Sequence, residues 1–491
     1  MLSPQILEKA KMTTFDQLAQ IITPSLLSSA GVPTASIAIL RDGKILNHTI
    51  TTGPHKADSE TLYQACSISK AIAALGVARL IDQGKLSYST RISSHLPQST
   101  IDILINPKTA HLFSLVTVGM LLSHTSGLSQ HGFPGYEAQP PSAETVLSGA
   151  APANTPRVHF SSFPGAQWSY SGGGFVVLQL FLEALLSRPF PDIMRELVLE
   201  PLGMTRSFYG ALPKDEGNYT EPYMTAATPA QAGHHTLPEM AAGGLWSTPS
   251  DLLKAVSAIQ HSSFLKPGSA KQLLAPIVSG TLGEPVGIWS HGWAVTPTLF
   301  GHGGSNDPGY RCYVCGSFAQ QPSALFPTEQ QRTQTWPEGT GLAIMTNSVL
   351  GEDLIPRLLN ALVYLLKLPP QVAGFPSWSG GLGKAVALPD ALMVSKDGWQ
   401  EWVGAWNSSA EQAKEWSVVQ LQDGKPGLSF DGHEAMGLVP AAAPVESAGE
   451  GKDVFWFVVD GLDVGVKLTW EGEERVVRIM QDQTETLHKR G

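Results

Sequence analysis

The stretch YQACSISKAIAALGVARLIDQGKL, residues 63–86, decides the fold because it predicts a helix that has no polar face. Residues 71–78 are all apolar, and charge returns only near the end of the helix, before Gly84. A helix that is apolar all round is an interior helix. Ser67 and Lys70 lie at the N-terminus of this helix. The sequence therefore predicts a lysine in a buried position, where the free energy of its charged form is raised.

Two interpretations of this Ser-x-x-Lys pattern are open: a solvated surface lysine, or an activated serine nucleophile. Residues three apart share one face of a helix, so the Ser67 hydroxyl and the Lys70 amine can meet. The helix N-terminus favours negative character on the serine oxygen, and burial favours the neutral amine, which can accept a proton. The pair would then form an activated nucleophile. A pattern this short occurs by chance, so the choice depends on the rest of the chain.

Composition excludes several classes of protein. The chain has 491 residues, which predicts two or three domains, and only 15% of them are charged, against about 25% in an ordinary domain. The net charge is −10 and no basic tract occurs, so nucleic acid is not an expected partner. No apolar run reaches the roughly 18 residues of a membrane span. The N-terminus reads as a surface helix and not as a signal peptide, so a cytoplasmic protein is expected.

Cysteine usage gives no sign of a metal centre. Cys312 and Cys315 form a C-x-x-C pattern, but they lie in GYRCYVCGSF, which reads as a strand. An odd separation along a strand places two side chains on opposite faces, and no second pair completes a zinc site. Cys66 is expected to serve packing. We therefore expect no metal and no cofactor.

The order of elements predicts an α+β fold. Residues 35–53 read as a hairpin turning at Asp42-Gly43. Residues 288–295, 299–318 and 340–348 read as three successive strands, followed by a last helix over 354–366. The N- and C-terminal strands can pair into one antiparallel sheet, with an all-helical region inserted between them. Residues 115–128 read as a short helix that Gly127 ends.

A second module is expected at the C-terminus. Residues 369–389 are rich in proline and glycine and read as a linker, and from about Trp399 the pattern alternates with period two. We therefore expect a catalytic domain over residues 1–370, a linker over 371–390 and an all-β, barrel-like domain over 391–491.

Two further motifs support the nucleophile interpretation. WSYSGGGF places Tyr170 on a glycine-rich turn, and GHGGSNDPGY places His302, Gly303 and Gly304 at the start of a strand. With Ser67-x-x-Lys70, this order resembles the serine β-lactamase and penicillin-binding-protein superfamily. The segments LIDQGKLSYSTRISSHLP, LLSHTSGL, PLGM and GGLWSTPSDL extend the resemblance over about residues 20–368.

The likeness is greatest to the class C-like branch, which includes esterases, D-aminopeptidases and fungal acyltransferases. The C-terminal module is similar to the lipocalin-like barrel of some peptidases in this superfamily. The resemblance implies a β-lactamase/transpeptidase-like fold. It also implies an acyl-serine mechanism without a cofactor.

Roles for individual residues follow from the resemblance. Ser67 would attack an acyl carbonyl, and Lys70 and Tyr170 would shuttle the proton, with either of them as the base. The backbone N–H groups of Ser67 and Ser305 would form the oxyanion hole. Substrate would lie along residues 303–304, where side chains are missing. His124 of LLSHTSGL could be a base, but the resemblance favours a structural role.

Two departures from the superfamily pattern bear on substrate. Gly172 stands where an asparagine is usual, and His302 stands where β-lactamases have a lysine. A mostly neutral histidine holds a carboxylate less well than a lysine. Both changes argue against β-lactamase or D,D-peptidase activity.

The expected function is a serine hydrolase or acyltransferase that acts on a small-molecule ester, thioester or amide, with secondary metabolism as one setting. A D-stereospecific aminopeptidase is the alternative enzyme. A catalytically degenerate, ligand-binding or filament-forming protein is the alternative from another class. The expected partner is a small acyl substrate, while an acyl acceptor or carrier and the oligomeric state stay open.

Overall fold

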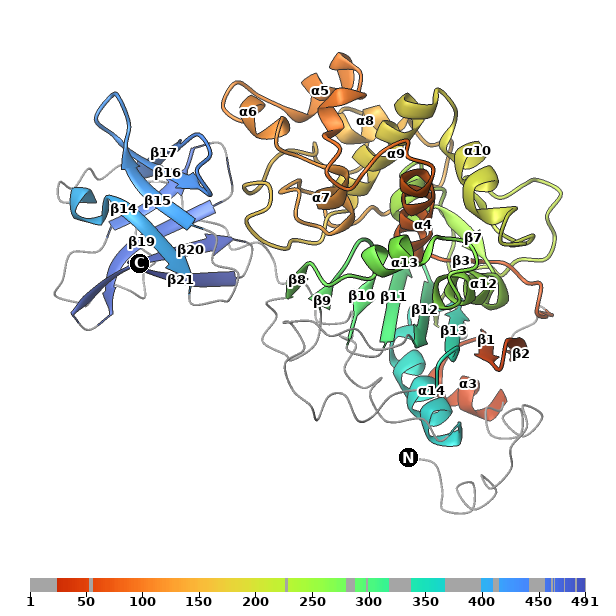
Figure 1. Cartoon of the computed structure of the whole chain (residues 1–491). Helices are drawn as coiled ribbons and strands as arrows, with labels where there is room; N and C mark the ends of the chain where they lie inside the picture. The colour runs from red at the N-terminus through yellow and green to blue at the C-terminus, as the bar shows by residue number, and fades with distance from the viewer. Residues whose placement is uncertain are drawn as a thin grey trace.

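The computed structural model describes residues 24–52, 56–225, 228–279, 288–296, 299–317, 337–366, 399–408, 415–440, 455–460, 462, 464–471, 473–481 and 484–490. A larger part that contains both helices and strands carries the motifs, and a smaller all-β part follows it in the chain (Figure 1). The predicted surface helix at the N-terminus and the predicted linker lie outside the described residues.

Eight strands form the central antiparallel sheet in the order β2-β1-β13-β12-β11-β10-β9-β8. Their bounds are Thr34–Arg41 (β1), Lys44–Thr51 (β2), Val278–Ser279 (β8), Ile288–Trp289 (β9), Ala294–Val295 (β10), Leu299–Asn306 (β11), Tyr310–Ser317 (β12) and Gly341–Thr346 (β13). The hairpin β1–β2 turns at Asp42-Gly43, where both residues have positive φ. Ala35 of β1 lies opposite Thr346 of β13, so the predicted pairing of N- and C-terminal strands is confirmed.

Two predicted strands were wrong. Where one strand was predicted over residues 299–318, two strands, β11 and β12, pair with each other in antiparallel fashion. Residues 288–295 form two short strands, β9 and β10, which pair with each other as a hairpin. Gly292, in the turn, has a φ of +85°, and a Cβ atom there would lie 2.6 Å from the Cβ of Ala74. The chain reverses at this point because glycine tolerates both the positive φ and the close contact with the buried helix.

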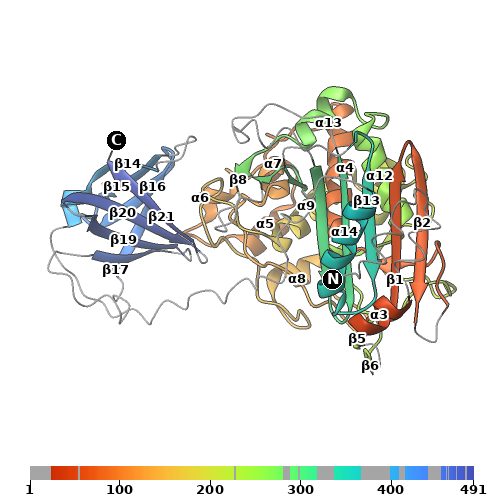
Figure 2. The ribbon, with the colours of Figure 1, turned by 90° about the horizontal axis from the view of Figure 1, so that it is seen from below.

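Helices cover both faces of the sheet (Figure 2). The first face packs against α4 (Ile68–Asp82) and α12 (Pro249–Gln260), and α13 (Pro267–Leu273) packs on α4. The second face packs against α3 (Pro24–Ala30) and α14 (Gly351–Leu365). Cys312 joins the core on the first face and Cys315 the core on the second. The prediction that these two cysteines point to opposite faces is therefore confirmed.

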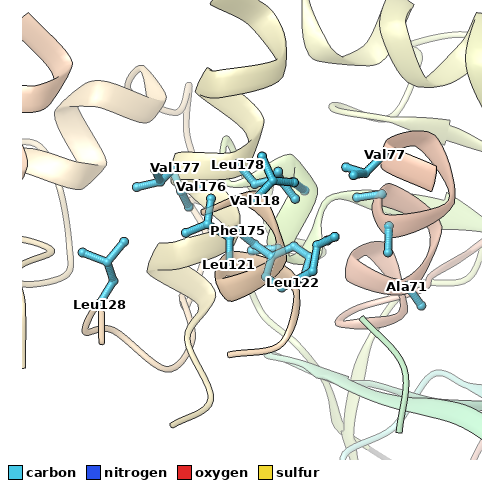
Figure 3. Close-up of a cluster of buried hydrophobic side chains, with 14 of the residues drawn as sticks. Ala71, Val77, Val118, Leu121, Leu122, Leu128, Phe175, Val176, Val177 and Leu178 are labelled. Carbon is cyan, nitrogen blue, oxygen red and sulfur yellow. The ribbon is translucent and has the colours of Figure 1, made fainter. Parts of the chain in front are cut away.

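The inserted helical region packs against α4. Its helices are α5 (Gln98–Leu104), α6 (Ala110–Phe113), α7 (Val118–Leu122), α8 (Ala143–Ser148), α9 (Gly172–Leu186), α10 (Phe190–Met194) and α11 (Met240–Gly243). Figure 3 shows apolar side chains of α4, α7 and α9 meeting in one buried cluster. Helix α7 ends at Leu122, so the prediction that Gly127 ends this helix was wrong. Gly127 instead has a φ of +73° in the loop that follows.

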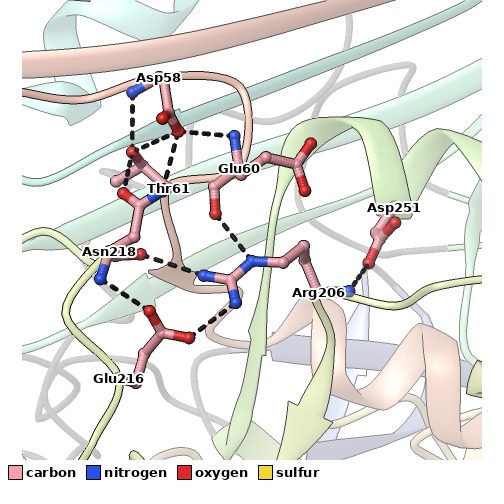
Figure 4. A network of polar contacts seen from close by, with 7 residues as sticks. All are labelled: Asp58, Glu60, Thr61, Arg206, Glu216, Asn218 and Asp251. Atoms are coloured by element: carbon pink, nitrogen blue, oxygen red, sulfur yellow. Dashed lines mark hydrogen bonds and ion pairs between the residues drawn. The ribbon is translucent and has the colours of Figure 1, made fainter.

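A small sheet leads the chain into α4. It consists of β3 (Tyr63–Gln64), β7 (Leu245–Ser247) and β4 (Phe208–Tyr209), in the order β3-β7-β4. The approach to β3 is held by Arg206, which donates hydrogen bonds to the carboxylate of Glu216 at 2.7 Å and to the carbonyl oxygen of Glu60 at 3.0 Å (Figure 4). The backbone N–H of Arg206 also donates to Asp251 of α12 at 2.9 Å. The residues before β3 are thus held by the Arg206 side chain, and the backbone of Arg206 is itself bound to α12.

The C-terminal part is a closed antiparallel barrel of eight strands. The strands are Gly404–Ser408 (β14), Glu415–Gln420 (β15), Pro426–Phe430 (β16), Met436–Pro440 (β17), Phe455–Val459 (β18), Val464–Glu471 (β19), Glu474–Gln481 (β20) and Thr484–Arg490 (β21). The barrel closes because β14 pairs with both β15 and β21. The predicted α+β fold followed by a barrel-like module is confirmed.

Across the described ranges, no single helix is both long enough and apolar enough to span a membrane. By length and composition alone, the bent pair Gly172–Leu186 and Phe190–Leu199 would pass, with an angle of 80° between its parts.

Candidate active site

Ser67 is placed at the point where β3 turns into α4. It is partly exposed within a run of buried residues from Thr61 to Ala78. Its side chain makes no capping hydrogen bond to the helix, so the hydroxyl is available for chemistry. Cys66, just before it, has a φ of +51°, a left-handed conformation that is costly for a residue with a side chain. This sharp turn presents Ser67 at the head of the helix.

Lys70 lies one helical turn further on and is 2% exposed. Its Nζ atom lies 3.1 Å from Ser67 Oγ and donates a hydrogen bond to the carbonyl oxygen of Ala242 at 2.6 Å. Burial lowers the pKa of Lys70 to about 7, against a small opposing effect of Cys66. A neutral amine held by the Ala242 carbonyl can turn its lone pair toward the serine hydroxyl. The interpretation as a surface lysine was wrong.

Tyr170 completes the group at the N-terminus of α9. The Lys70 Nζ atom lies 5.0 Å from the centroid of its ring. Burial raises the pKa of Tyr170 well above its usual value, although an interaction with the Ser67 side chain opposes the shift. At neutral pH the phenol therefore keeps its proton, and Lys70 is the group that can accept one. The structure thus brings together the three residues for which the sequence predicted catalytic roles.

His124 holds Tyr170 in place. Its ring lies 4.3 Å from the Tyr170 ring, its Nδ1 atom accepts a hydrogen bond from the backbone N–H of Ser171 at 3.0 Å, and its carbonyl oxygen accepts one from Ser169 at 2.8 Å. Burial, and then the charge of Lys70, lower its pKa well below the usual value. A neutral histidine whose Nδ1 atom is already occupied positions Tyr170 from both sides, which supports the expected structural role.

Replacing His124 by phenylalanine should keep the ring contact but leave the Ser171 N–H without its acceptor. An unsatisfied buried donor costs about 1–3 kcal/mol, so we expect the free energy of unfolding to fall by that amount. We also expect slower acylation of Ser67, because Tyr170 would lose its fixed position. Chemical denaturation and the rate of acyl-enzyme formation measure the two effects. Unchanged values for both would show that this hydrogen bond does not hold Tyr170.

Strand β11 carries the predicted substrate-binding residues. His302 is 1% exposed, and burial followed by the Lys70 charge lowers its pKa to about 3, so its ring is neutral. Its Nδ1 atom lies 2.5 Å from the carbonyl oxygen of Gly303. Strand β10 pairs only with Phe300 and Gly301. Among the described strands, none therefore covers that edge of β11 from His302 onward, where substrate could pair. Ser305 is exposed near the end of β11, and its oxyanion role stays a prediction.

A glycine is required at position 304 because β11 and the turn before Ser67 lie too close together for a side chain. A Cβ atom at this position would lie 2.7 Å from the Sγ of Cys312 and 2.7 Å from the Cβ of Cys66. It would also lie 2.9 Å from the carbonyl oxygen of Ala65, in the turn before the nucleophile. Gly304 thus lets β11 pack against the serine-bearing turn, a reason that the sequence interpretation missed.

Gly172 also has a structural reason. A Cβ atom here would lie 2.8 Å from the carbonyl oxygen of His131 and 3.0 Å from the ring of Phe133. An asparagine therefore does not fit at this position without movement of the loop over residues 130–133. Gly172, which was interpreted from the sequence only for its bearing on substrate, thus also has a steric reason.

Aromatic side chains beside Tyr170 were not singled out from the sequence. Trp289 lies 6.0 Å from Tyr170 and 5.7 Å from Trp168, measured between ring centroids. Trp289 also contacts the His302 ring at 5.4 Å. The part of the chain that the structure describes holds no group of three or more histidine, cysteine or acidic residues suited to a metal ion.

Comparison with known proteins identifies the family of this chain. The sequence profile of a family described as Beta-lactamase matches residues 10–364. The chain belongs to the beta-lactamase family. Among curated relatives, penicillin-binding protein 4 from Amycolatopsis lactamdurans is 27% identical over 190 residues, which are 38% of this chain and 46% of the relative.

AmpH from Escherichia coli, a D-alanyl-D-alanine-carboxypeptidase/endopeptidase, is 24% identical over 209 residues, 42% of this chain and 50% of AmpH. The chain thus spans about half the length of the curated relatives it matches.

Solved structures share the fold of this beta-lactamase family member. The octameric penicillin-binding protein homologue from Pyrococcus abyssi has a TM-score of 0.53 at 18% identity, over 97% of this chain and all of the other. D-amino acid amidase from Ochrobactrum anthropi SV3, in complex with L-phenylalanine, has a TM-score of 0.55 at 18% identity, over 74% of this chain and 98% of the other. At such identities the likeness concerns the fold alone.

Proposed function

We propose that this protein is a serine hydrolase or acyltransferase that forms an acyl-enzyme on Ser67. The observation that carries the proposal is the placement of Lys70, whose buried amine lies 3.1 Å from the serine oxygen and has a pKa of about 7. A base whose pKa is near the working pH is the most effective kind. The same placement disfavours a degenerate protein, because a buried lysine is costly to keep without a use.

The reaction can be written through these residues. Neutral Lys70 takes the proton of the Ser67 hydroxyl while Oγ attacks the acyl carbonyl, and backbone N–H groups of Ser67 and Ser305 stabilise the oxyanion. Tyr170, still protonated, gives its proton to the leaving group and regains one from the Lys70 ammonium. Water or an alcohol then takes the acyl group by the reverse path.

The surroundings favour an uncharged, apolar acyl group. Tyr170 and Trp289 pack together, with Trp168 beside them, in an aromatic cluster separate from the main core. His302 is neutral, so it offers no charge to a substrate carboxylate. Esters and thioesters of simple acids suit such a site better than penicillins, which carry a carboxylate.

A D-stereospecific aminopeptidase or amidase is the second candidate. It is supported by the name of AmpH, a D-alanyl-D-alanine-carboxypeptidase/endopeptidase, among the curated relatives. A D-amino acid amide carries an ammonium group, whose recognition needs a partner such as an aromatic face or a carboxylate. The aromatic cluster could supply that face, so this class belongs in the test.

Substrate preference is tested by comparing kcat/KM for a p-nitrophenyl acyl ester, nitrocefin and a D-amino acid p-nitroanilide, each corrected for its intrinsic reactivity. We expect the ester to exceed nitrocefin by at least about 100-fold, because an unpaired polar group of the substrate is strongly penalised. Adding a primary alcohol and measuring the ester product separates acyl transfer from hydrolysis.

Nitrocefin turnover equal to that of the ester would overturn the proposed preference and restore a β-lactamase. A preference for the D-amino acid anilide would select the second candidate. If no acyl group were found on Ser67 with any of the three, the protein would not be an enzyme of this class.

A further inference from the structure

Among the described residues, two aromatic ring contacts join the barrel to the catalytic part. Phe163, 1% exposed, projects from the segment before Tyr170, and its ring lies 5.7 Å from Trp416 and 6.4 Å from Phe430. Trp416 of β15 and Phe430 of β16 are direct cross-strand partners, with rings 4.6 Å apart. We call Phe163, Trp416 and Phe430 the aromatic junction.

The junction lies at the end of the barrel. Trp416 and Val418 are the buried residues of the alternating strand β15, so their side chains face the barrel interior. Phe163 therefore contacts the inward-facing side of the barrel, near the start of β15. The Lys108–Asp460 ion pair also links the two parts, but both side chains are largely exposed, and such pairs contribute little.

The segment between Phe163 and Tyr170 is tied to the loop that follows α7. The backbone N–H of Gly165 donates to the Thr125 carbonyl oxygen at 2.6 Å, and that of Ser169 donates to the His124 carbonyl oxygen at 2.8 Å. Together with the bond from Ser171 to the His124 ring, these contacts hold the segment along its length.

The same loop closes over the segment at Gly127. A Cβ atom there would lie 2.3 Å from the carbonyl oxygen of Ser162, so the two backbones pack without space for a side chain. A displacement of Phe163 therefore reaches Tyr170 through a short, hydrogen-bonded piece of backbone.

We propose that the barrel is a positioning domain for Tyr170. Docking of Phe163 in the barrel end fixes the segment that presents the phenol, and so raises the rate at which Ser67 is acylated, whatever the acyl donor. This inference rests on the proposed function, since it assigns Tyr170 a part in acylation. A barrel that contacted the substrate would instead change KM, and the change would depend on the acyl donor.

The test uses full-length variants Phe163→Ala and Trp416→Ala and the double variant. The readouts are the second-order rate of Ser67 phosphorylation by diisopropyl fluorophosphate and the kcat and KM of an acyl ester. In the first reaction the Oγ–P bond forms, fluoride leaves and the serine proton passes to Lys70. We expect each single variant to lower both the phosphorylation rate and kcat by about 10- to 100-fold, with KM little changed, because small misplacements of a catalytic group are costly.

The double variant should be no worse than the poorer single variant, because both remove one contact. Trp402→Phe is the matched control. This buried barrel tryptophan contacts Phe455 and Trp470 instead of the junction, so its rates should stay near the wild type. Hydrogen exchange should accelerate at the amides of residues 165–171 in Phe163→Ala and not in Trp402→Phe. If Phe163→Ala does not fold, Phe163→Leu serves in its place with a smaller expected loss.

Phosphorylation and kcat at wild-type levels in the junction variants would overturn the inference, and so would a loss confined to a donor-dependent KM. Both results would leave the proposed function standing, because the wild type would still be acylated. A wild type that is not acylated at all would instead refute the proposed function.

Discussion

Replacing Ser67 by alanine is expected to abolish the acyl-enzyme and to lower turnover by about 10⁴-fold or more, since no neighbouring group can replace the nucleophile. The reacting atom is the Oγ atom that lies 3.1 Å from Lys70 Nζ. The fold should stay intact, because the Ser67 side chain makes no capping hydrogen bond to α4. Intact-protein mass spectrometry after incubation with an acyl ester measures the acyl-enzyme directly.

Ser69→Ala is the matched control. The Ser69 hydroxyl donates to the carbonyl oxygen of Cys66 at 2.5 Å and accepts from the backbone N–H of Leu245 at 3.0 Å. Its loss should lower the free energy of unfolding by about 1–3 kcal/mol, while Ser67 still gains the acyl mass. Near-normal turnover in Ser67→Ala would refute the whole mechanism.

The sequence could predict those parts of the fold that depend on local periodicity. The buried helix over residues 68–82 follows from its missing polar face, and the hairpin at Asp42-Gly43 follows from turn chemistry. The opposite faces of Cys312 and Cys315 follow from the period of a strand. Ser67, Lys70 and Tyr170 were found because short motifs occurred in a fixed order.

Contacts between distant segments could not be predicted in this way. The carbonyl oxygen that accepts the hydrogen bond of Lys70 belongs to Ala242. Every residue has a backbone carbonyl, so the sequence does not indicate which one contacts Lys70. The sequence suggested that Gly304 and Gly172 serve substrate recognition. Each is also required because another segment lies too close for a side chain: the turn before Ser67 in the case of Gly304, and the loop over residues 130–133 in the case of Gly172. The choice of base was also open, because it depends on how deeply Lys70 and Tyr170 are buried.

Lys70→Ala and Tyr170→Phe are each expected to lower kcat/KM by about 10²- to 10⁴-fold, the usual contribution of general acid–base catalysis. The double variant should be little worse than the poorer single variant, since both residues serve one proton path. If the loss of kcat/KM in the double variant equalled the product of the two single losses, the two residues would act independently. Lys254→Ala removes a partly exposed lysine of α12 that pairs with the buried carboxylate of Asp251, so it should leave the rate near the wild type.

The pH dependence identifies the base. Because burial lowers the pKa of Lys70 to about 7, the amine is neutral above that pH and protonated below it. The kcat/KM of the wild type for an acyl ester should therefore be constant above about pH 7 and fall about tenfold per unit below it. Tyr170 has a raised pKa and stays protonated throughout this range. Tyr170→Phe should thus keep the acidic limb, while Lys70→Ala should lose it. An acidic limb that vanishes in Tyr170→Phe but persists in Lys70→Ala would assign the base to the tyrosine instead.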